Sequence, residues 1–323
     1  MIQPPLRKVD LHVHTVFSNF RHLKILKARD SYNDPMAVYR RCLEAGSDYV
    51  AITDHDTIEG ALDLLSRDPS LEPSVIVGEE VETWFPETGQ WVHVNVLGVD
   101  EASHRDIQKA RASIYDLIGY LRGKGLMHFL NHPFQSYRLQ SRPMDYVEKV
   151  LDLFTHVEMG NGTLPPAQNR AAAAILEFGR RLGVDRFGVA GSDAHGLRPI
   201  GAFMTMAPGE NKSAWIRSVK EGNCLVAGRE IGLGGLLGEV YSIVGQYYRH
   251  LAAPGGMKGM RLRNLAAAAG FVPVCVAGVP AILPSITWAG TSAVSALVHR
   301  SMRRAASRSK EPDPALRGPA EVR

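Results

Sequence analysis

The feature that most constrains this chain is a regular alternation of short apolar runs with segments of helical spacing. Between residues 8 and about 232 this alternation repeats six or seven times. A helix that connects two strands returns the chain across the sheet, so this order favours an α/β fold with a parallel sheet. Its length approaches the ~250 residues typical of α/β barrels, which suits closure into a barrel. The expected strands are 9–14, 49–53, 75–77, 92–97, 127–130, 156–159 and 188–190, and the expected helices are 34–45, 58–65, 107–124, 144–153, 166–182 and 214–221.

Composition excludes several classes of protein. The chain is 45% hydrophobic and 22% charged, values typical of globular proteins and unlike wholly disordered or collagen-like chains. Its three cysteines, Cys42, Cys224 and Cys275, are too few and too far apart for a disulfide scaffold or a cysteine-based zinc finger. Because residues 1–10 contain no apolar run, we expect no signal peptide and a cytoplasmic protein.

Charge is distributed unevenly along the chain. Residues 1–235 hold 26 Lys or Arg and 29 Asp or Glu, whereas residues 236–323 hold 11 and 4. An acidic body does not favour non-specific binding of nucleic acid, and no interleaving of basic and aromatic residues predicts sequence-specific reading. Acidic residues can instead serve as ligands for cations.

Histidines and acids gather at the predicted strands and strand ends. His12 and His14 are two residues apart on one strand, so both side chains leave the same face. Alone, a His-x-His pair is about as often an ordinary pair of core or surface histidines, and a lone Glu pair is usually in a solvated loop. Six positions along the chain carry such residues: His12 with His14, Asp54 with His55 and Asp56, Glu79 with Glu80, His93, Asn131 with His132, and Asp193 with His195.

The chemistry of these side chains points to a metal site. The carboxyl ends of parallel strands are where α/β folds place their active sites. Imidazoles and carboxylates without cysteine are the ligands of Zn, Mn or Fe in hydrolytic sites. About eight candidate ligands exceed the need of one cation, so we predict two or three divalent ions.

In their order along the chain, these motifs resemble the PHP family of polymerase and histidinol phosphatase domains. The resemblance covers about residues 8–230, or roughly 70% of the chain, and the combination of motifs is far more specific than each motif alone. It implies a distorted (β/α)7 barrel with up to three metal ions at the carboxyl ends of the strands. The motifs are His12-x-His14, Thr53-Asp54-His55-Asp56-Thr57, Gly78-x-Glu80, His93, His132-Pro133 and Asp193-x-His195.

The resemblance also implies which residues share each ion. A first ion is held by His12, His14, Glu80 and Asp193, a second by Glu80, His93 and His132, and a third by His55 and His195. One departure affects the third ion. The family has Ser-Asp-Gly after its first motif, and that Asp is a ligand, whereas this chain has Ser18-Asn19-Phe20. Asn19 is a neutral, poorer ligand at that position, and His22 and Asp30 are candidates to replace it.

The predicted activity is hydrolysis of phosphoesters by metal-activated water. The substrates expected are small phosphorylated metabolites, nucleotides or oligonucleotide ends. His195 and Asp56 are the candidate proton-transfer residues, and Asp10 is a candidate to orient a histidine. Arg138, Arg142 and Arg198 are candidates to bind a substrate phosphate, although surface arginines are more often simply solvated. Glu158 and Asn161 line the pocket or form a structural turn.

Two other functions are compatible with the sequence. A metal-binding but catalytically weak regulatory or scaffolding module, anchored through its C-terminal segment, is suggested by Asn19. An amidohydrolase uses similar ligands on similar barrels, but it usually relies on a carbamylated lysine, and no lysine stands at a predicted strand end.

The last part of the chain differs from the rest. Residues 264–298 contain no Asp, Glu, Lys or Arg, and basic residues precede and follow them. Pro280 and Pro284 divide this stretch into two arms, each shorter than the ~20 residues that span a bilayer. We therefore expect a membrane-associating hairpin at the cytoplasmic face, with a single membrane span as the second interpretation. The alternative without a membrane is a set of helices docked on the barrel, or a surface for a partner. The predicted organisation is a barrel at 1–235, an amphipathic linker or helix at 236–263, the apolar segment at 264–299, and a basic, disordered tail at 300–323.

Overall fold

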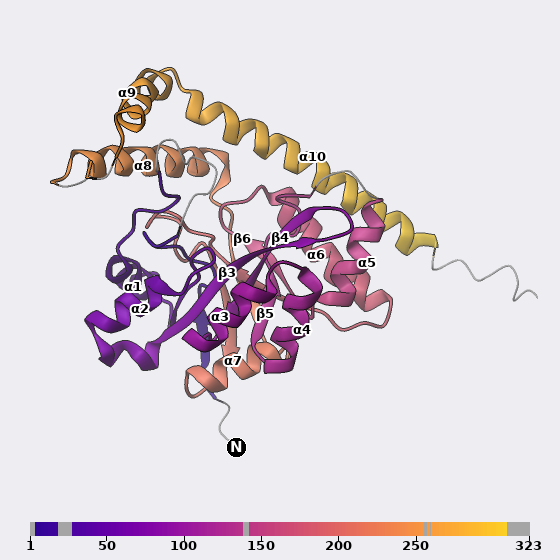
Figure 1. Ribbon diagram of the computed structural model, residues 1–323. Coiled ribbons are helices and arrows are strands. Elements are labelled where there is room, and N and C mark those ends of the chain that lie inside the picture. Colours follow the sequence, from indigo (N-terminus) through magenta and orange to yellow (C-terminus); the bar gives the residue numbers. More distant parts are fainter. Residues whose placement is uncertain (1–3, 19–27, 138–141, 255–256, 259, 309–323) are drawn as a thin grey trace, which may run out of the picture.

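The computed structural model describes residues 4–18, 28–137, 142–254, 257–258 and 260–308. It is a mixed α/β protein with a six-stranded sheet that curls into half a barrel and with a long C-terminal apolar helix (Figure 1). The six-stranded sheet has the order β2-β3-β4-β5-β6-β7, and a second sheet has the order β1-β8-β9. The strands are β1 (Leu6–Val9), β2 (Val50–Ile52), β3 (Val75–Phe85), β4 (Gln90–Leu97), β5 (Met127–Leu130), β6 (His156–Asn161), β7 (Phe187–Gly191), β8 (Phe203–Pro208) and β9 (Leu225–Gly228).

Helices connect most of these strands, as the sequence pattern predicts. They are α1 (Pro35–Glu44), α2 (Glu59–Arg67), the 3-10 helix η1 (Pro69–Ser74), α3 (Glu101–Ala110), α4 (Ile114–Lys124), α5 (Pro143–Leu153), α6 (Pro166–Arg181), α7 (Lys212–Lys220), α8 (Gly232–Ala252), α9 (Leu262–Val276) and α10 (Val279–Arg308). The single helix expected over 107–124 is two helices, because the Ser113 side chain accepts a hydrogen bond from the N–H of Tyr115 and so caps a new helix start.

The sheet is not parallel throughout, which corrects the sequence-based expectation. Strand β2 is parallel to β3, and β5, β6 and β7 are parallel to one another, but β4 is antiparallel to both β3 and β5. The four residues between β3 and β4 are too few for a crossover, which needs a dozen or more, so the chain reverses in a hairpin. Gly89, at φ 64°, supplies the left-handed residue of this turn.

The structure does not confirm a closed seven-stranded barrel. Strand β1 pairs with β8 in the second sheet. Just beyond β1, the N–H of His14 donates to the carbonyl of Ala194, past the end of β7, at 3.0 Å. The carbonyl of Val13 accepts from the N–H of Thr53, past the end of β2, also at 3.0 Å. Residues 13–14 therefore link the two outer edges of the curled sheet at its carboxyl end.

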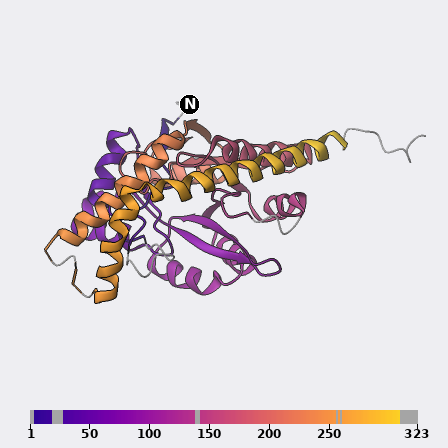
Figure 2. The same cartoon turned by 90° about the horizontal axis from the view of Figure 1, so that it is seen from above.

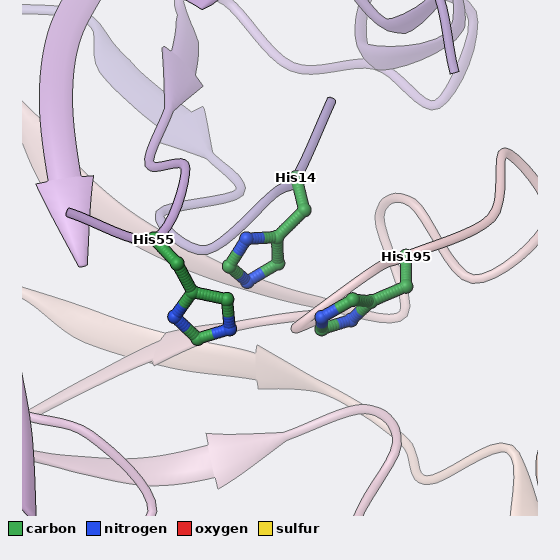
Figure 3. A group of neighbouring side chains, drawn as sticks. All are labelled: His14, His55 and His195. Carbon is green, nitrogen blue, oxygen red and sulfur yellow. The ribbon is translucent and has the colours of Figure 1, made fainter. Parts of the chain in front are cut away.

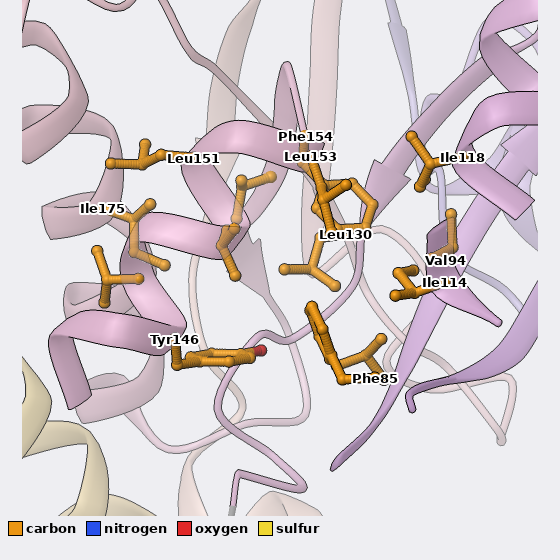
Figure 4. Close-up of a cluster of buried hydrophobic side chains, with 14 of the residues drawn as sticks. Phe85, Val94, Ile114, Ile118, Leu130, Tyr146, Leu151, Leu153, Phe154 and Ile175 are labelled. Atoms are coloured by element: carbon orange, nitrogen blue, oxygen red, sulfur yellow. The ribbon is translucent and has the colours of Figure 1, made fainter. Parts of the chain in front are cut away.

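Helices cover the outer surface of the curled sheet and bury its apolar side chains. The largest cluster packs β3, β4 and β5 against α4, α5 and α6, with Phe85, Leu130 and Phe154 at its centre (Figure 4). Helices α1 and α2 cover β2, and Trp215 of α7 packs between β1 and β2. The rigid body so formed fixes the strand ends on which the polar clusters lie.

The C-terminal helices only partly follow the prediction. The amphipathic helix expected over 236–251 is present as α8. The apolar segment breaks at Gly278, at φ 80°, and not at the prolines. Pro280 and Pro284 both lie near the start of α10, where Pro280 costs no intrahelical hydrogen bond because the first N–H groups of a helix have no partner.

The expected disordered tail is wrong for residues 300–308, which continue α10. Val298, Met302 and Ala306 are buried in the largest core cluster, where the second half of α10 packs on α5 and α6. Residues 309–323 lie outside the described residues. By length and composition, Val279–Ser307 is long and apolar enough to cross a membrane.

Candidate metal centre

The eight described candidate ligands meet at the carboxyl end of the curled sheet. His12 and His14 follow β1, His55 follows β2, His132 follows β5, and Asp193 and His195 follow β7, while Glu80 and His93 lie within the β3–β4 hairpin. Two isolated parallel bridges, Val13 with Ala194 and His55 with Glu80, hold neighbouring strand ends together. Figure 3 shows His14, His55 and His195 converging from three separate segments of the chain.

The ligand atoms form four overlapping groups, each with its atoms within 4.8 Å of one another. They are His14 with His55 and His195, His12 with Glu80 and His132, His12 with His14 and Asp193, and His55 with Glu80 and His93. All eight described residues that the sequence predicts as ligands take part. The groupings differ in detail from those implied by the family resemblance, because His14 also faces His55 and His195, and His55 also faces Glu80.

Distances within the groups match shared coordination. Oε2 of Glu80 lies 3.1 Å from Nε2 of His12, 3.3 Å from Nε2 of His14 and 3.1 Å from Nδ1 of His55. Two ligands bound tetrahedrally at ~2.0–2.1 Å from one ion are separated by about 3.4 Å. The side chains therefore already stand at ligand-to-ligand spacing.

Among the buried polar atoms without a hydrogen-bond partner in the described residues are two that belong to the ligand groups. They are Nε2 of His14 and Oε2 of Glu80, which lie 3.3 Å apart, and a divalent cation would be a partner for both. An unsatisfied buried polar atom costs about 1–3 kcal/mol, so such atoms are rare in proteins. Both atoms carry a lone pair, and a divalent ion between them would accept both lone pairs. The residues present therefore fit the metal ions that the sequence predicts.

Burial and mutual charge shift the pKa of most of these side chains. Burial lowers the pKa of His14 to about 4, and the neighbouring His195 acts in the same direction. Burial also lowers the pKa of His55, to about 3, against the opposing effect of Glu80. Both imidazoles are therefore neutral at pH 7 and offer a lone pair, as metal binding requires.

The two carboxylates of the cluster are ionised. Burial alone would raise the pKa of Glu80 and of Asp193, but the neighbouring histidines, His12 foremost, hold both pKa values well below their usual range. Burial alone would lower the pKa of His93, but the charge of Glu80 outweighs burial and raises this pKa to about 9. Without a cation, His12 and His93, whose pKa values are raised by these carboxylates, balance their charge, and a bound divalent cation would take over that role.

Glu158 lies directly behind the ligands and orients two of them. Its Oε1 is 2.9 Å from Nδ1 of His12, and its Oε2 accepts from the N–H of His132 at 2.9 Å. Asn161 donates to Oε2 of Glu158 and to Oδ2 of Asp193. Of the two interpretations left open by the sequence, the structure places Glu158 and Asn161 at the site. Such outer carboxylates fix the tautomer and direction of a ligating histidine.

Two further buried acids hold the backbone that carries the ligands. Asp10 accepts from the N–H groups of Ser192 at 2.7 Å and Gly201 at 2.8 Å, and burial raises its pKa to about 6. It therefore orients main chain, in addition to the weaker bond from the N–H of His12. Asp54 accepts from both the N–H and the hydroxyl of Thr15 at 2.6 Å.

Backbone strain is concentrated at the same place. His132, at φ 23°, and Asp193, at φ 56°, occupy the sparsely populated positive region that costs a non-glycine residue about 1–3 kcal/mol. Gly191, just before Asp193, is needed for close approach, since a Cβ there would lie 2.5 Å from both N and Cβ of His12. Placing these ligands therefore lowers the conformational stability of the fold.

The remaining predicted site residues lie elsewhere or outside the described residues. Asp56, predicted as a proton-transfer residue, forms an ion pair with Arg111 at 2.6 Å and accepts from the N–H of Glu82. Arg142 is exposed at the start of α5, and Arg198 is exposed just beyond His195. Asn19, His22 and Arg138 lie outside the described residues.

Sequence reasoning did not single out Glu239, which the structure places beside the site. Glu239 of α8 is 6% exposed, and its Oε2 has no hydrogen-bond partner in the described part of the chain. A Cβ on Gly196 would lie 1.9 Å from that oxygen, so α8 packs closely against the loop that carries His195. Only the tertiary structure brings these two segments together, some 40 residues apart in the chain.

Comparison with known proteins supports the fold and leaves the family open. No family model matches the chain. The uncharacterized protein MJ1587 of Methanocaldococcus jannaschii is 34% identical over 76 residues, which is 24% of this chain and 44% of that protein. The match thus spans less than half of the relative's length.

Three solved structures are similar to this chain at low identity, and one of them, PsfC, reaches a TM-score of 0.50. PsfC from Pseudomonas syringae has a TM-score of 0.50 at 16% identity, covering 76% of this chain and 99% of PsfC. An amidohydrolase from Chromobacterium violaceum, solved with sulfate and no metal, has a TM-score of 0.46 at 17% identity, covering 67% and 97%. A Bifidobacterium adolescentis protein of inferred metal-dependent phosphoesterase activity has 0.45 at 18%, covering 68% and 96%. At these identities the likeness concerns the fold, and the case for function rests on the site.

Proposed function

We propose that this protein is a metal-dependent hydrolase that cleaves phosphoesters. The observation that carries the proposal is the convergence of eight imidazole and carboxylate side chains into four overlapping groups, with buried atoms of His14 and Glu80 that no hydrogen bond satisfies. Divalent cations, when bound in such a site, supply Lewis acidity and make water a nucleophile near neutral pH. Zn, Mn and Fe all suit this donor set.

In this proposal some residues hold the cations, and others orient the side chains that do so. Glu80 would be the ligand shared between two ions, because its two oxygens face different histidines: Oε1 lies 2.9 Å from His93 and 3.0 Å from His132, while Oε2 faces His12 and His14. Glu158 and Asn161 fix the directions of His12 and Asp193 from behind. This rigid backing keeps the ligands in place without a reorganisation cost when substrate arrives.

Exposure indicates the side from which substrate approaches. The side chains of His12 and His14 are fully buried, whereas those of His55 and His195 are 21% and 26% exposed. In the proposal, a phosphoryl group enters on the side of His55 and His195, where His195 serves as a ligand of the cation. Arg198, exposed three residues further on, supplies positive charge for the substrate phosphate.

The decisive experiment combines elemental analysis with an activity panel. Purified protein is loaded with Mn²⁺ or Zn²⁺ and assayed on phosphomonoesters, dinucleotides and short oligonucleotides. We expect hydrolysis by the wild type, loss of at least 100-fold in Glu80→Gln, and little loss in Glu79→Gln. Glu79 is an apt control because it is buried next to Glu80 but bonds His104 and Gln108 on the outer side.

Two outcomes would redirect the proposal. Stoichiometric metal binding without turnover of any phosphoester would favour the alternative of a catalytically weak regulatory or scaffolding module. Protein that retains no metal after loading would contradict the proposal outright, because the site chemistry described here requires it.

A further inference from the structure

We propose that Asp30 is the carboxylate ligand of a cation held by His55 and His195, and that the C-terminal helices keep it in place. This inference rests on the proposed metal-dependent function and takes up one of the two candidates that the sequence offers in place of Asn19. Asp30 is 5% exposed and lies on the segment that leads into α1.

The geometry of Asp30 is that of a ligand. Its Oδ2 lies 3.6 Å from Nε2 of His55 and 3.7 Å from Nε2 of His195. These separations are close to the about 3.4 Å expected of two ligands that share one tetrahedral ion. The imidazole of His14 belongs to the same group as His55 and His195. Three imidazoles and one carboxylate make a complete four-ligand set.

The other oxygen of Asp30 is a second, independent observation. Its Oδ1 is buried and has no hydrogen-bond partner in the described part of the chain. A buried carboxylate without full hydrogen bonding carries a large desolvation cost unless a charge compensates it. A cation between Asp30, His55 and His195 supplies that charge.

Local contacts position Asp30 with respect to the ligands. Ser18 donates from Oγ to Oδ2 of Asp30 at 3.1 Å, and the same Oγ accepts from the N–H of His55. Asn33 donates from its side chain to the carbonyl of His195 at 3.0 Å. The segment around Asp30 is therefore tied both to the His55 loop and to the His195 loop.

The C-terminal helices pack against the same segment from outside. The ring of Tyr32 lies near those of Tyr247 and His250 of α8, at 6.4 Å and 5.7 Å between centroids. Ala28 and Tyr32 join α8 and α9 in a small hydrophobic cluster that includes Phe271. The C-terminal segment thus has a structural role at the metal centre, which the barrel by itself does not provide.

The test compares metal binding by full-length variants. Asp30→Asn keeps the size of the side chain and removes its charge, and Asp34→Asn is the matched control, since Asp34 caps α1 four residues further on. Metal content after equilibrium dialysis against Zn²⁺ or Mn²⁺ is measured by elemental analysis. We expect Asp30→Asn to bind one equivalent fewer, or to bind it at least 10-fold more weakly, and Asp34→Asn to match the wild type.

A cysteine variant gives a spectroscopic readout that does not depend on activity. Asp30→Cys loaded with Co²⁺ is expected to show a thiolate-to-cobalt charge-transfer band that the wild type lacks. Tyr247→Ala, which removes a ring that packs near Tyr32, is expected to weaken the same equivalent by severalfold. Unchanged metal content and affinity in folded Asp30→Asn, or no such band in Asp30→Cys, would overturn the inference while leaving the proposed function intact. A wild type that binds no ion would overturn both.

A separate observation carries a second inference, about α9 and the first half of α10. We propose that this surface docks on an anionic lipid bilayer. Its large apolar side chains are exposed: Leu262 and Val276 of α9 are 82% and 84% exposed, and Leu283 and Ile286 of α10 are 69% and 63% exposed. Val279, Ile282, Leu283 and Ile286 follow helical spacing, so they share one face of α10.

The basic residues around this surface favour a membrane as its partner over a second copy of the chain. Residues 264–298 carry no Asp, Glu, Lys or Arg, and exposed basic residues border them. Anionic headgroups attract such borders, whereas two copies would bring like charges together. Figure 1 shows α8, α9 and α10 together on the side of the molecule away from the N-terminus, and Figure 2, seen from that side, shows α10 running across the body. The bordering residues are Lys258, Arg261 and Arg263 before the stretch and Arg300, Arg303 and Arg304 after it.

The test is sedimentation of the full-length protein with lipid vesicles. We expect binding to vesicles that contain phosphatidylglycerol, weaker binding to pure phosphatidylcholine, and a reduction of at least 10-fold in the triple variant Ile282→Gln/Leu283→Gln/Ile286→Gln. Leu225→Gln is the matched control, because Leu225 is 61% exposed on β9. Equal binding by the triple variant, or no binding by the wild type, would overturn the inference. Concentration-dependent self-association that the triple variant abolishes would assign the surface to a second copy instead.

Discussion

The outer carboxylate Glu158 offers the most specific test of how the metal centre is organised. It meets three donors or potential donors: Nδ1 of His12, the N–H of His132 and the side-chain amide of Asn161. In Glu158→Gln the side chain keeps its volume, but one of its two acceptors becomes an NH₂ donor. Whichever way the amide is turned, at least one donor of the site then faces another donor.

The expected cost follows from these contacts. With Glu158 in place, Nδ1–H of His12 donates to the carboxylate, which leaves Nε2 free to face Glu80 and Asp193 at 3.1 Å and 3.5 Å. Loss of such an outer partner typically weakens metal binding by 10–100-fold, or about 1.4–2.7 kcal/mol. The metal-free protein also loses a buried charged hydrogen bond worth about 1.5–3 kcal/mol.

The assay is a competition titration with a chelating indicator, accompanied by thermal unfolding of the metal-free protein. Glu79→Gln is the control, because Glu79 is equally buried but its bonds to His104 and Gln108 lie outside the ligand groups. It is expected to lose stability and to keep its metal affinity. Unchanged affinity in Glu158→Gln, or an equal loss in Glu79→Gln, would refute the role assigned to Glu158.

Three further predictions concern the fold around the site. Gly191→Ala places a Cβ 2.5 Å from the His12 backbone nitrogen and should lower stability by at least the ~1–3 kcal/mol of overpacking, measured by chemical unfolding; a neutral result would mean that the strand end can move. Burial lowers the pKa of His156 to about 4, so the unfolded chain binds its proton first, and stability should fall by roughly 3 kcal/mol as pH drops from ~6.5 to ~4. His156→Gln should flatten that part of the pH profile, and an unaltered profile would contradict the assignment. Met302→Ala should cost ~2–4 kcal/mol in unfolding experiments if α10 packs in the core, whereas Leu283→Ala should cost almost nothing; equal effects would speak against the docked half of α10.

Much of the site was predictable because metal ligands are few in kind and lie at strand ends. His12 and His14 share a face by the period of a strand, and the adjacent Glu79 and Glu80 point to opposite sides, as an extended chain requires. Asp56 was less predictable, because its pairing with Arg111 depends on α3 and α4 packing beside β3. Glu158 remained undecided in the sequence for a similar reason, since its partners are 26 and 146 residues away.

The fold shows the same division. The alternation of strands and helices predicts an α/β protein, but the antiparallel β4 comes from a connection of four residues that interrupts the pattern. The apolar segment breaks at Gly278 and not at the prolines, because a helix start tolerates proline. Residues 300–308 are helical because apolar side chains of α5 and α6 pack against them. Neither the position of this break nor these packing partners can be predicted from local composition alone.

What the sequence by itself determined is therefore chemical: the ligand types, their order, and the expectation that they meet at one edge of a sheet. What only the tertiary structure decided is which atoms lie close enough to share a centre, which buried acids stand behind them, and that α8 packs beside the site from a distant part of the chain. The physical reason is that side-chain chemistry and local periodicity are written in neighbouring residues, whereas burial, charge pairing and ligand spacing arise only when remote segments pack together.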